Sequence, residues 1–263
     1  GQPEFISSED HLRADSVPIP RFWVSESRVK PQIGEYPFDW LVGFKNVTAP
    51  TNERTFLCTV LPLSGVGNSV PLILNLGQKS PLDIVCLVGS LTSFVYDFVV
   101  RQKMGNVNLN FYIVEQLPVL SPDRYTPDLL DVIVPRVVEL TYTAWDLQPF
   151  ARDVLDEVGE ETWARWFESD HLGSPAPVHD SPPPAWAAGD TPAPFVWDEE
   201  RRARLRAELD GLYAHLYGLT RDELAYILHA FPIVKRKDEA QYGEYRTKRM
   251  VLERFENLEL LKI

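Results

Sequence analysis

The sequence predicts an α+β chain, in which a domain of short β-strands and long helices precedes a small helical C-terminal module. Three observations lead there: strand-like apolar runs before residue 80, capped helices after them, and a proline-rich stretch before a wholly helical tail. We therefore divide the chain into an entry segment (1–37), an α+β domain (38–170), a proline-rich linker or loop (171–196) and a helical module (197–263).

Four short apolar runs have the composition of strands. Trp40–Phe44 and residues 55–61 are rich in aromatic and branched side chains, and a turn with proline and asparagine separates them. Residues 71–76 follow a glycine-containing turn, and residues 111–117 end at a proline. All four are expected to be strands, whereas the proline-rich entry segment before them is expected to be a loop with short extended pieces.

Two helix starts are marked by a hydroxyl residue directly before a proline, Ser80-Pro81 and Thr126-Pro127. The hydroxyl accepts a hydrogen bond from an unpaired backbone N–H, and a proline at the first helical position gives up no hydrogen bond. The first helix is expected to run to about residue 103. The second contains Pro135, which predicts a kink or an interruption.

The rest of the chain is expected to be helical on both sides of one proline-rich stretch. Helical spacing resumes over residues 151–167, and residues 172–194 then hold too many prolines for regular hydrogen bonding. An amphipathic helix is expected over 199–217. A capping box that begins at Thr220 starts a short helix, and a last helix covers about 245–260.

The net charge of −12 argues against a protein that coats nucleic acid without preference. The charge is uneven, because residues 235–254 hold seven Lys and Arg against four Asp and Glu, a local balance of 7 − 4 = +3. Two interpretations stay open for this segment: a local surface that attracts DNA, and an ordinary solvated helix.

The sequence carries no recognisable catalytic motif. Residues 180–186 resemble an Asp-Pro-Pro-aromatic loop only loosely, and the glycines of residues 64–68 precede a predicted strand rather than a helix. Cys58 and Cys86 lie in apolar contexts and are expected to be buried thiols. We therefore expect no catalysis, no cofactor and no metal in this chain, and an independent small enzyme is disfavoured.

Location follows from two further patterns. The longest apolar stretch, residues 82–100, is broken by polar residues and is expected to be a core helix, and no secretory signal opens the chain. The expectation is a cytoplasmic protein that does not contact a membrane.

Four segments, taken in order, carry a resemblance. They are residues 45–62, with the run Thr-Asn-Glu-Arg-Thr; 87–101, with a Leu-Thr-Ser-Phe helix; 110–119, which ends in Leu-Pro-Val; and 208–248. The set resembles the region after the catalytic domain in large N6-adenine DNA methyltransferases, namely type IIG restriction-modification enzymes and their phage-defence relatives. Thr92 stands where that family more often has asparagine.

The resemblance implies a C-terminal fragment whose catalytic domain, which binds S-adenosylmethionine, lies upstream. The function expected from it is DNA target recognition and positioning for adenine methylation, in a parent with or without a nuclease. The expected partners are double-stranded DNA, bound weakly by this chain alone, the upstream methyltransferase domain and other defence-system subunits. The alternative is a protein–protein docking module of a phage-defence complex, which the acidic balance and helical tail favour. The host is expected to be bacterial.

Candidate DNA-binding residues follow from their chemistry. Asn52 and Arg54 carry the amide and guanidinium that pair with adenine and guanine edges, although both could instead serve the turn. Arg101 and Lys103, at a predicted helix end, could contact phosphates or complement the helix dipole. Basic residues of the tail could contact the DNA backbone or form the outer face of a packed helix: Lys235, Arg236, Lys237, Arg246, Lys248 and Arg249.

Overall fold

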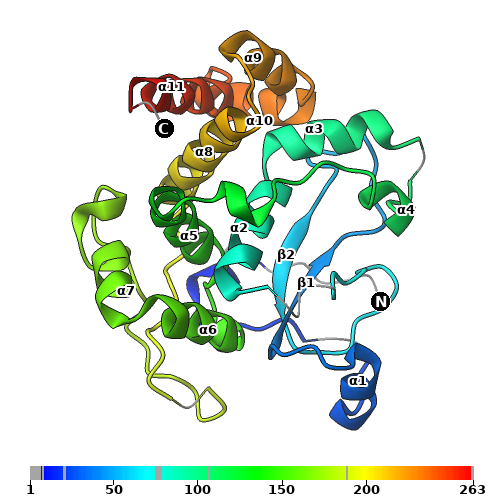
Figure 1. Cartoon of the computed structure of the whole chain (residues 1–263), viewed down its shortest axis with the longest axis vertical. Helices are drawn as coiled ribbons and strands as arrows, with labels where there is room; N and C mark the ends of the chain where they lie inside the picture. Colours follow the sequence, from blue (N-terminus) through cyan, green and yellow to red (C-terminus); the bar gives the residue numbers. More distant parts are fainter. Residues whose placement is uncertain are drawn as a thin grey trace.

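The computed structural model describes residues 7, 9–19, 22–74, 79–105, 107–187 and 189–261, without the side chains of 258–261. Within this part the chain combines helices with one small antiparallel sheet, so its mixed α and β composition is confirmed (Figure 1). The elements are α1 (Glu26–Ile33), β1 (Trp40–Phe44), β2 (Cys58–Pro62), α2 (Pro81–Leu91), α3 (Phe94–Lys103), α4 (Phe111–Val114), α5 (Pro127–Thr141), α6 (Gln148–Val158), α7 (Glu160–Phe167), α8 (Glu199–Leu216), α9 (Arg221–His229), α10 (Pro232–Tyr242) and α11 (Arg246–Leu261).

The sheet consists of β1 and β2, paired antiparallel with Trp40 opposite Pro62 and Phe44 opposite Cys58. The first predicted strand is confirmed. The second begins later than predicted, because the backbone N–H of Thr55 donates to the carboxylate of Asp97 at 3.1 Å instead of joining the ladder. The start of this strand is therefore decided by a tertiary contact.

The third predicted strand, 71–76, is reduced to a single antiparallel bridge between Gly43 and Leu72 in the described residues. Phe44 N donates to Pro71 O at 3.0 Å, and Ile73 N donates to Val42 O at 2.9 Å. Pro71 has no N–H to continue the ladder. Residues 75 and 76 lie outside the described part of the chain.

The predicted start at Ser80 is confirmed, since the Ser80 hydroxyl accepts from Asp83 N at 3.2 Å. The prediction of one helix to residue 103 is wrong. α2 ends at Leu91, α3 starts at Phe94, and the two axes differ by 63°. Among the described helices, none is long and apolar enough by itself to cross a membrane; α2 and α3 reach that length and composition only as this bent pair.

The break between α2 and α3 is a second cap. The hydroxyl of Ser93 accepts from Tyr96 N at 3.2 Å and donates to Ser90 O at 2.7 Å, while Phe94 N donates to the buried carboxylate of Asp210 at 2.7 Å. These contacts satisfy N–H groups that a continuous helix would have used internally.

We expect Ser93→Ala to lower the free energy of unfolding by about 1–2 kcal/mol, because the lost cap is buried and leaves Tyr96 N without its acceptor. Urea titration measures the change. Ser181→Ala, at an exposed loop position, is the control and should stay within about 0.5 kcal/mol of the unmodified chain. Equal values for the two variants would contradict the assignment of the cap.

The predicted strand at 111–117 is wrong: the segment forms the short helix α4 followed by a turn. Ile113 and Leu117, four residues apart, are buried, whereas Phe111 and Tyr112 are exposed to solvent. Spacing of four places the buried side chains on one face of a helical turn. The short apolar run carried no period that separates a helix from a strand.

The helices of the middle segment follow the prediction with two breaks. The Thr126 cap of α5 is confirmed, and Pro135 lies inside a continuous helix. Because Pro135 has no N–H, it cannot donate to the carbonyl of Asp131 four residues earlier. That carbonyl instead lies 2.8 Å from His171 Nε2 and forms a hydrogen bond with it. The predicted helical region 151–167 is divided into α6 and α7 at Gly159, whose φ of 80° ends the first helix.

The entry segment differs from the expected loop, because it contains α1. Glu26 lies in its first turn and pairs with Lys30 at 2.6 Å, and Gly34, with φ of 62°, ends it. These are local helix signals, and the prolines around them concealed the pattern.

The proline-rich segment 172–194 packs over α5 and α7. Phe195, at its end, is buried beside Tyr142, Trp163 and Phe167, and the Tyr142 hydroxyl donates to Pro192 O at 2.9 Å. Regular elements of three or more residues are absent from the described part of 173–194, as the proline content predicts.

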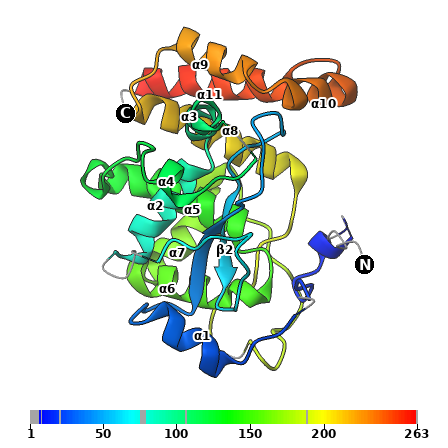
Figure 2. The ribbon, with the colours of Figure 1, turned by 90° about the vertical axis from the view of Figure 1, so that its right-hand side faces the viewer.

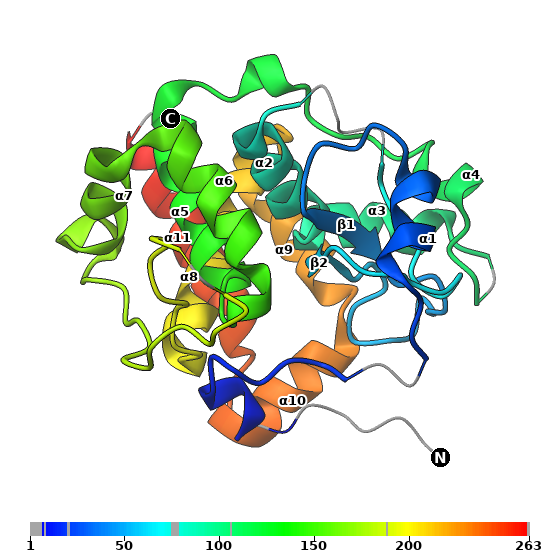
Figure 3. The ribbon, with the colours of Figure 1, turned by 90° about the horizontal axis from the view of Figure 1, so that it is seen from below.

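Two hydrophobic clusters share α3 and α8. The larger lies among the sheet, α2 and α5–α7; the smaller joins α3 and α8 to α9 and α11. Tyr213 of α8 belongs to the first and Ala214 to the second. Figure 2 shows α9, α10 and α11 as a layer over α3 and α8, and Figure 3 shows α5–α7 opposite the sheet and α4. The predicted module boundary at 197 stays a prediction.

The tail contains the predicted helices and one more. The capping box at Thr220 is confirmed, with hydrogen bonds in both directions between Thr220 and Glu223. The additional helix is α10, which starts with Pro232 at its first turn and ends at Gly243, where φ is 75°. Both signals are local, although the segment before Gly243 has a low apolar content.

Candidate nucleic-acid interface

The loop between β1 and β2 is anchored by a buried carboxylate. Asp97, which is 0% exposed, accepts from Arg54 Nε at 2.6 Å, from Thr55 N at 3.1 Å and from Arg101 Nε at 3.3 Å. We call Arg54, Thr55, Asp97 and Arg101 the Asp97 cluster. The carboxylate of Asp97 and the guanidinium groups of Arg54 and Arg101 compensate one another, whereas any of these charges would be costly if it were buried alone.

Arg101 fixes the loop from inside. Its Nη1 donates to the carbonyls of Pro50 and Ala230, and its Nη2 donates to those of Asn52 and Glu53, at 2.8–3.0 Å. Burial lowers the pKa of Arg101, while Asp97 opposes that shift. The predicted contact of Arg101 with a phosphate does not fit this arrangement, because its described donors are directed at protein carbonyls.

Arg54 is also turned inward. Its guanidinium lies over the rings of Phe94 (4.2 Å) and Phe231 (5.8 Å), and its Nη2 donates to Thr92 O at 2.5 Å. The alternative that Arg54 serves the loop is therefore favoured by the geometry over contact with a guanine edge. Phe94 begins α3 and Phe231 directly precedes α10, so the two contacts hold the loop against the starts of both helices.

Asn52 occupies the exposed tip of this loop. Its Nδ2 donates to Thr48 Oγ1 at 3.3 Å, a contact that supports the turn, and the rest of the side chain faces solvent. Beside it, Glu53 pairs with Lys237 of α10 at 2.5 Å. The structure thus brings Asn52, Arg54, Arg101 and Lys237 together, although they are far apart in sequence.

The basic side chains of α10 and α11 mostly pair with acids. Lys235 pairs with Glu239, Arg249 with Glu244 and Glu253, and Arg246 with Glu200. Exposed ion pairs of this kind contribute about 0–1 kcal/mol, so exchange of a carboxylate for a phosphate costs little. Within the described residues, Lys103 and Arg236 are exposed and belong to no ion pair.

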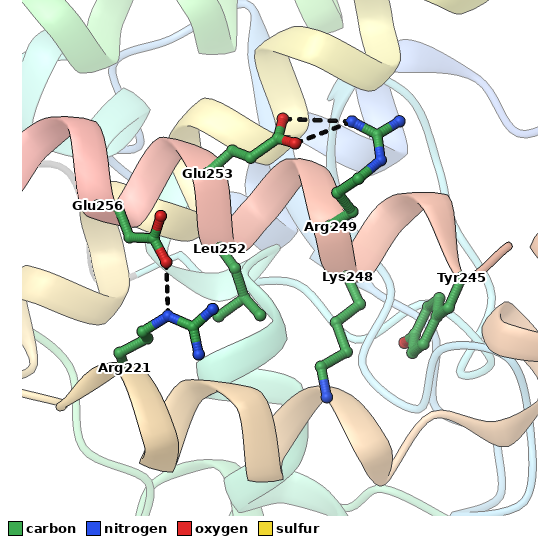
Figure 4. A pocket seen from close by; sticks show the side chains of 7 residues that line it. All are labelled: Arg221, Tyr245, Lys248, Arg249, Leu252, Glu253 and Glu256. Atoms are coloured by element: carbon green, nitrogen blue, oxygen red, sulfur yellow. Dashed lines mark hydrogen bonds and ion pairs between the residues drawn. The ribbon is translucent and has the colours of Figure 1, made fainter.

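A groove between α9 and α11 gathers further cations. It encloses about 400 Å³ and is lined by Arg221, Tyr245, Lys248, Arg249, Leu252, Glu253 and Glu256 (Figure 4). Lys248 reaches across from α11 to His229 of α9, with Nζ 2.7 Å from Nε2. Burial and the neighbouring Arg221 and Lys235 lower the pKa of Lys248. An anion in this groove would relieve the repulsion among these cations.

Sequence reasoning missed Arg221. It pairs with Glu256 at 2.5 Å across the groove, yet it occupies the first position of α9, where a positive charge opposes the helix dipole. This unfavourable charge at the start of α9 was the signal in the sequence that could have identified Arg221. An arginine placed against the dipole indicates that a contact outside its own helix holds it.

Comparison with known proteins adds no relative. No protein-family model, curated protein or solved structure matches the chain. Among the described residues, no group of three or more His, Cys, Asp or Glu is arranged to hold a metal ion. Both cysteines are buried as predicted, and burial raises the pKa of Cys58 to about 12. The functional argument therefore depends on the loop, the groove and their surroundings.

Proposed function

We propose that this chain is the DNA target-recognition and positioning part of an adenine-specific DNA methyltransferase whose catalytic domain belongs to the parent protein. The observation that carries the proposal is the Asp97 cluster, which holds the Thr-Asn-Glu-Arg-Thr loop rigidly against the basic C-terminal helices. Figure 2 shows this loop reaching up to the layer of α9–α11. Such a protein acts in the bacterial cytoplasm.

In this arrangement the loop would determine sequence specificity, and the basic side chains of the C-terminal helices would contribute affinity for the DNA backbone. A loop that is already ordered presents Asn52 to a base edge without an ordering cost on binding. Lys248, Arg221 and Arg236 supply positive charge for phosphates, which fix position but carry no sequence information. The remaining acidic surface keeps general affinity low, so the catalytic domain supplies the rest of the grip on a flipped adenine.

One observation favours a second candidate, a docking module for another protein. Most basic side chains of the tail already have carboxylate partners in this chain, and the net charge is −12. A surface of satisfied ion pairs suits contact with a protein as well as with DNA. The two candidates differ in salt dependence, because each phosphate contact releases counterions from DNA.

Binding of duplex DNA to the chain is expected to be weak at moderate salt and to fall steeply between about 50 and 200 mM. Lys248→Gln and Arg236→Gln should each weaken all sequences alike and reduce the slope of log K against log salt by about one unit. Fluorescence anisotropy of a labelled duplex measures both quantities. The matched control is Lys30→Gln, an ion-paired lysine on α1 at the opposite end of the molecule from α9–α11.

Slopes for Lys248→Gln and Arg236→Gln equal to that of Lys30→Gln would reject both the groove, which Lys248 lines, and Arg236 of α10 as phosphate contacts, and would favour docking. A second arm concerns sequence preference. Asn52→Ala should change the preferred base pair at one position, by about 1–3 kcal/mol, in duplexes selected from a random pool. An unchanged preference would assign Asn52 to the turn alone.

A further inference from the structure

We infer that three loops beside α4 form a pocket for one planar nitrogen heterocycle, an unpaired nucleobase. The pocket encloses about 400 Å³ and is lined by Asn46, Asn68, Pro71, Asn110, Phe111 and Tyr112. Sites for small ligands enclose roughly 300–1,000 Å³ and combine apolar walls with a few convergent polar groups. The inference goes beyond the proposed function and uses it only for the source of the base, a DNA strand.

Backbone hydrogen bonds hold the three loops together. Asn46, just after β1, donates from its N to Ser69 O at 3.0 Å and accepts at its O from Leu109 N at 2.9 Å. A further bond joins Thr48 N to Val107 O at 3.1 Å. The segment after β1 is therefore fixed between the Asn68 loop and the Asn110 loop. A site built in this way is ordered before a ligand arrives.

The strongest single observation is the side chain of Asn46. Its Nδ2 donates to Asn68 O at 3.4 Å, which sets the orientation of the amide. Its Oδ1 is buried and has no hydrogen-bond partner in the described part of the chain. A buried acceptor without a donor is costly, so an unpaired Oδ1 among the lining residues indicates a ligand that donates an N–H.

Two further asparagines, Asn68 and Asn110, line the same pocket. Asn110 precedes α4 but its side chain makes no capping hydrogen bond, and Asn68 uses its backbone carbonyl rather than its side chain for the bond to Asn46. An asparagine amide offers one acceptor and two donors, the pattern that pairs with the N6 and N7 edge of adenine. We therefore expect adenine, which offers a donor and an acceptor on that edge, to be the preferred base.

Two rings supply the apolar walls. Phe111 and Tyr112 are 50% and 57% exposed, so both rings can be reached from solvent. Phe111 is nevertheless oriented, because its ring meets buried Phe44 edge-on with centroids 5.8 Å apart. Stacking of a base on an aromatic ring is favourable and tolerates any base, since every base has a flat face.

The lining residues also exclude other ligand classes. They include no charged side chain, so the group bound there is not a phosphate or a carboxylate. Three amides around a lipid chain would lose their hydrogen bonds to water without replacement. A neutral, flat molecule with donors and acceptors on its edge can stack on the aromatic rings and form hydrogen bonds with the asparagine side chains.

The test uses a single-stranded thymine oligonucleotide with one central 2-aminopurine, whose fluorescence falls when the base stacks. Addition of the chain should quench the signal, and Tyr112→Ala and Asn110→Ala should each weaken binding by about tenfold or more, in line with the loss of one stacking or one amide contact. The matched control is Tyr226→Ala, because Tyr226 is 69% exposed on α9, away from the pocket. Free adenosine, added as competitor, distinguishes a free ligand from a strand: displacement at similar concentration means that the pocket binds the base alone.

Each outcome bears on one proposal. Quenching that Tyr112→Ala and Asn110→Ala abolish and Tyr226→Ala preserves supports the pocket, whether or not adenosine competes. Absence of quenching, or equal affinity for all three variants, overturns it. Salt-dependent duplex binding without quenching would leave the proposed function standing and reject the pocket; quenching without duplex binding would do the reverse.

Discussion

Replacing Asp97 with alanine is expected to lower the free energy of unfolding by about 3–5 kcal/mol, because removal of one partner from a buried ion pair leaves uncompensated charge. Two guanidinium groups, of Arg54 and Arg101, and the N–H of Thr55 lose their shared acceptor at once. Arg54 and Arg101 also hold Phe231 by cation–π contact, so the loss should extend to the packing of α10.

Urea titration followed by circular dichroism measures the effect. Asp97→Asn should lie between alanine and the unmodified chain, because an amide oxygen still accepts from Thr55 N but carries no charge for the two arginines. Asp180→Asn, at an exposed loop position, is the control and should change stability by less than about 0.5 kcal/mol. If Asp97→Ala does not fold, Asp97→Asn alone decides, and a value near that of Asp180→Asn would contradict the structural role of the cluster.

Features that depend on neighbouring residues were predictable from the sequence. The starts at Ser80, Thr126 and Thr220 are each decided by a side-chain oxygen and an N–H three residues later. The break before α3 obeys the same chemistry, since Ser93 is itself a cap. It was missed because the apolar spacing continues across it, and because Asp210, which receives Phe94 N, is distant in sequence.

The candidate site was predictable only in part. Sequence patterns singled out Asn52, Arg54 and Arg101, and the structure places all three in one region. The inward direction of both arginines could not be predicted, because Asp97 and Phe231 reach them from other elements. Asn46 and Asn110 were inconspicuous in sequence, since an asparagine beside a strand or a helix is ordinary until the chain folds them into one pocket.

The Asp97 cluster and the pocket differ in whether their polar groups find hydrogen-bond partners within the protein. Asp97 and Arg101 form their hydrogen bonds with other groups of the protein, and these bonds fix the conformation of the loop between β1 and β2. Asn46 Oδ1, by contrast, remains unsatisfied among the described residues. Polar groups left over by folding are better candidates for ligand contact than the most highly charged residues of the sequence.

Asp210 should make stability depend on pH in a direction opposite to that of most acids. Burial raises the pKa of its carboxyl to about 6; Arg54 and Arg206 oppose the shift and Asp97 adds to it. The folded chain then holds this proton more tightly than the unfolded chain, whose value is near 3.8. Stability from Asp210 is therefore complete below about pH 4 and is lost as the pH rises through 6, by about 3 kcal/mol at 1.4 kcal/mol per pKa unit.

Asparagine at position 210 retains an oxygen for Phe94 N but does not titrate, so Asp210→Asn isolates this effect. Its cost, measured by urea titration of both chains, should be smaller at pH 7 than at pH 4 by about 2–3 kcal/mol. Asp131→Asn is the control of opposite sign, because Arg165 and Trp166 lower the pKa of Asp131 and its contribution is present at neutral pH and lost in acid. An Asp210→Asn cost that is equal at both pH values, or that grows toward pH 7, would show that Asp210 keeps an ordinary pKa in the folded chain and that its charge is stabilised by Arg54 and Arg206.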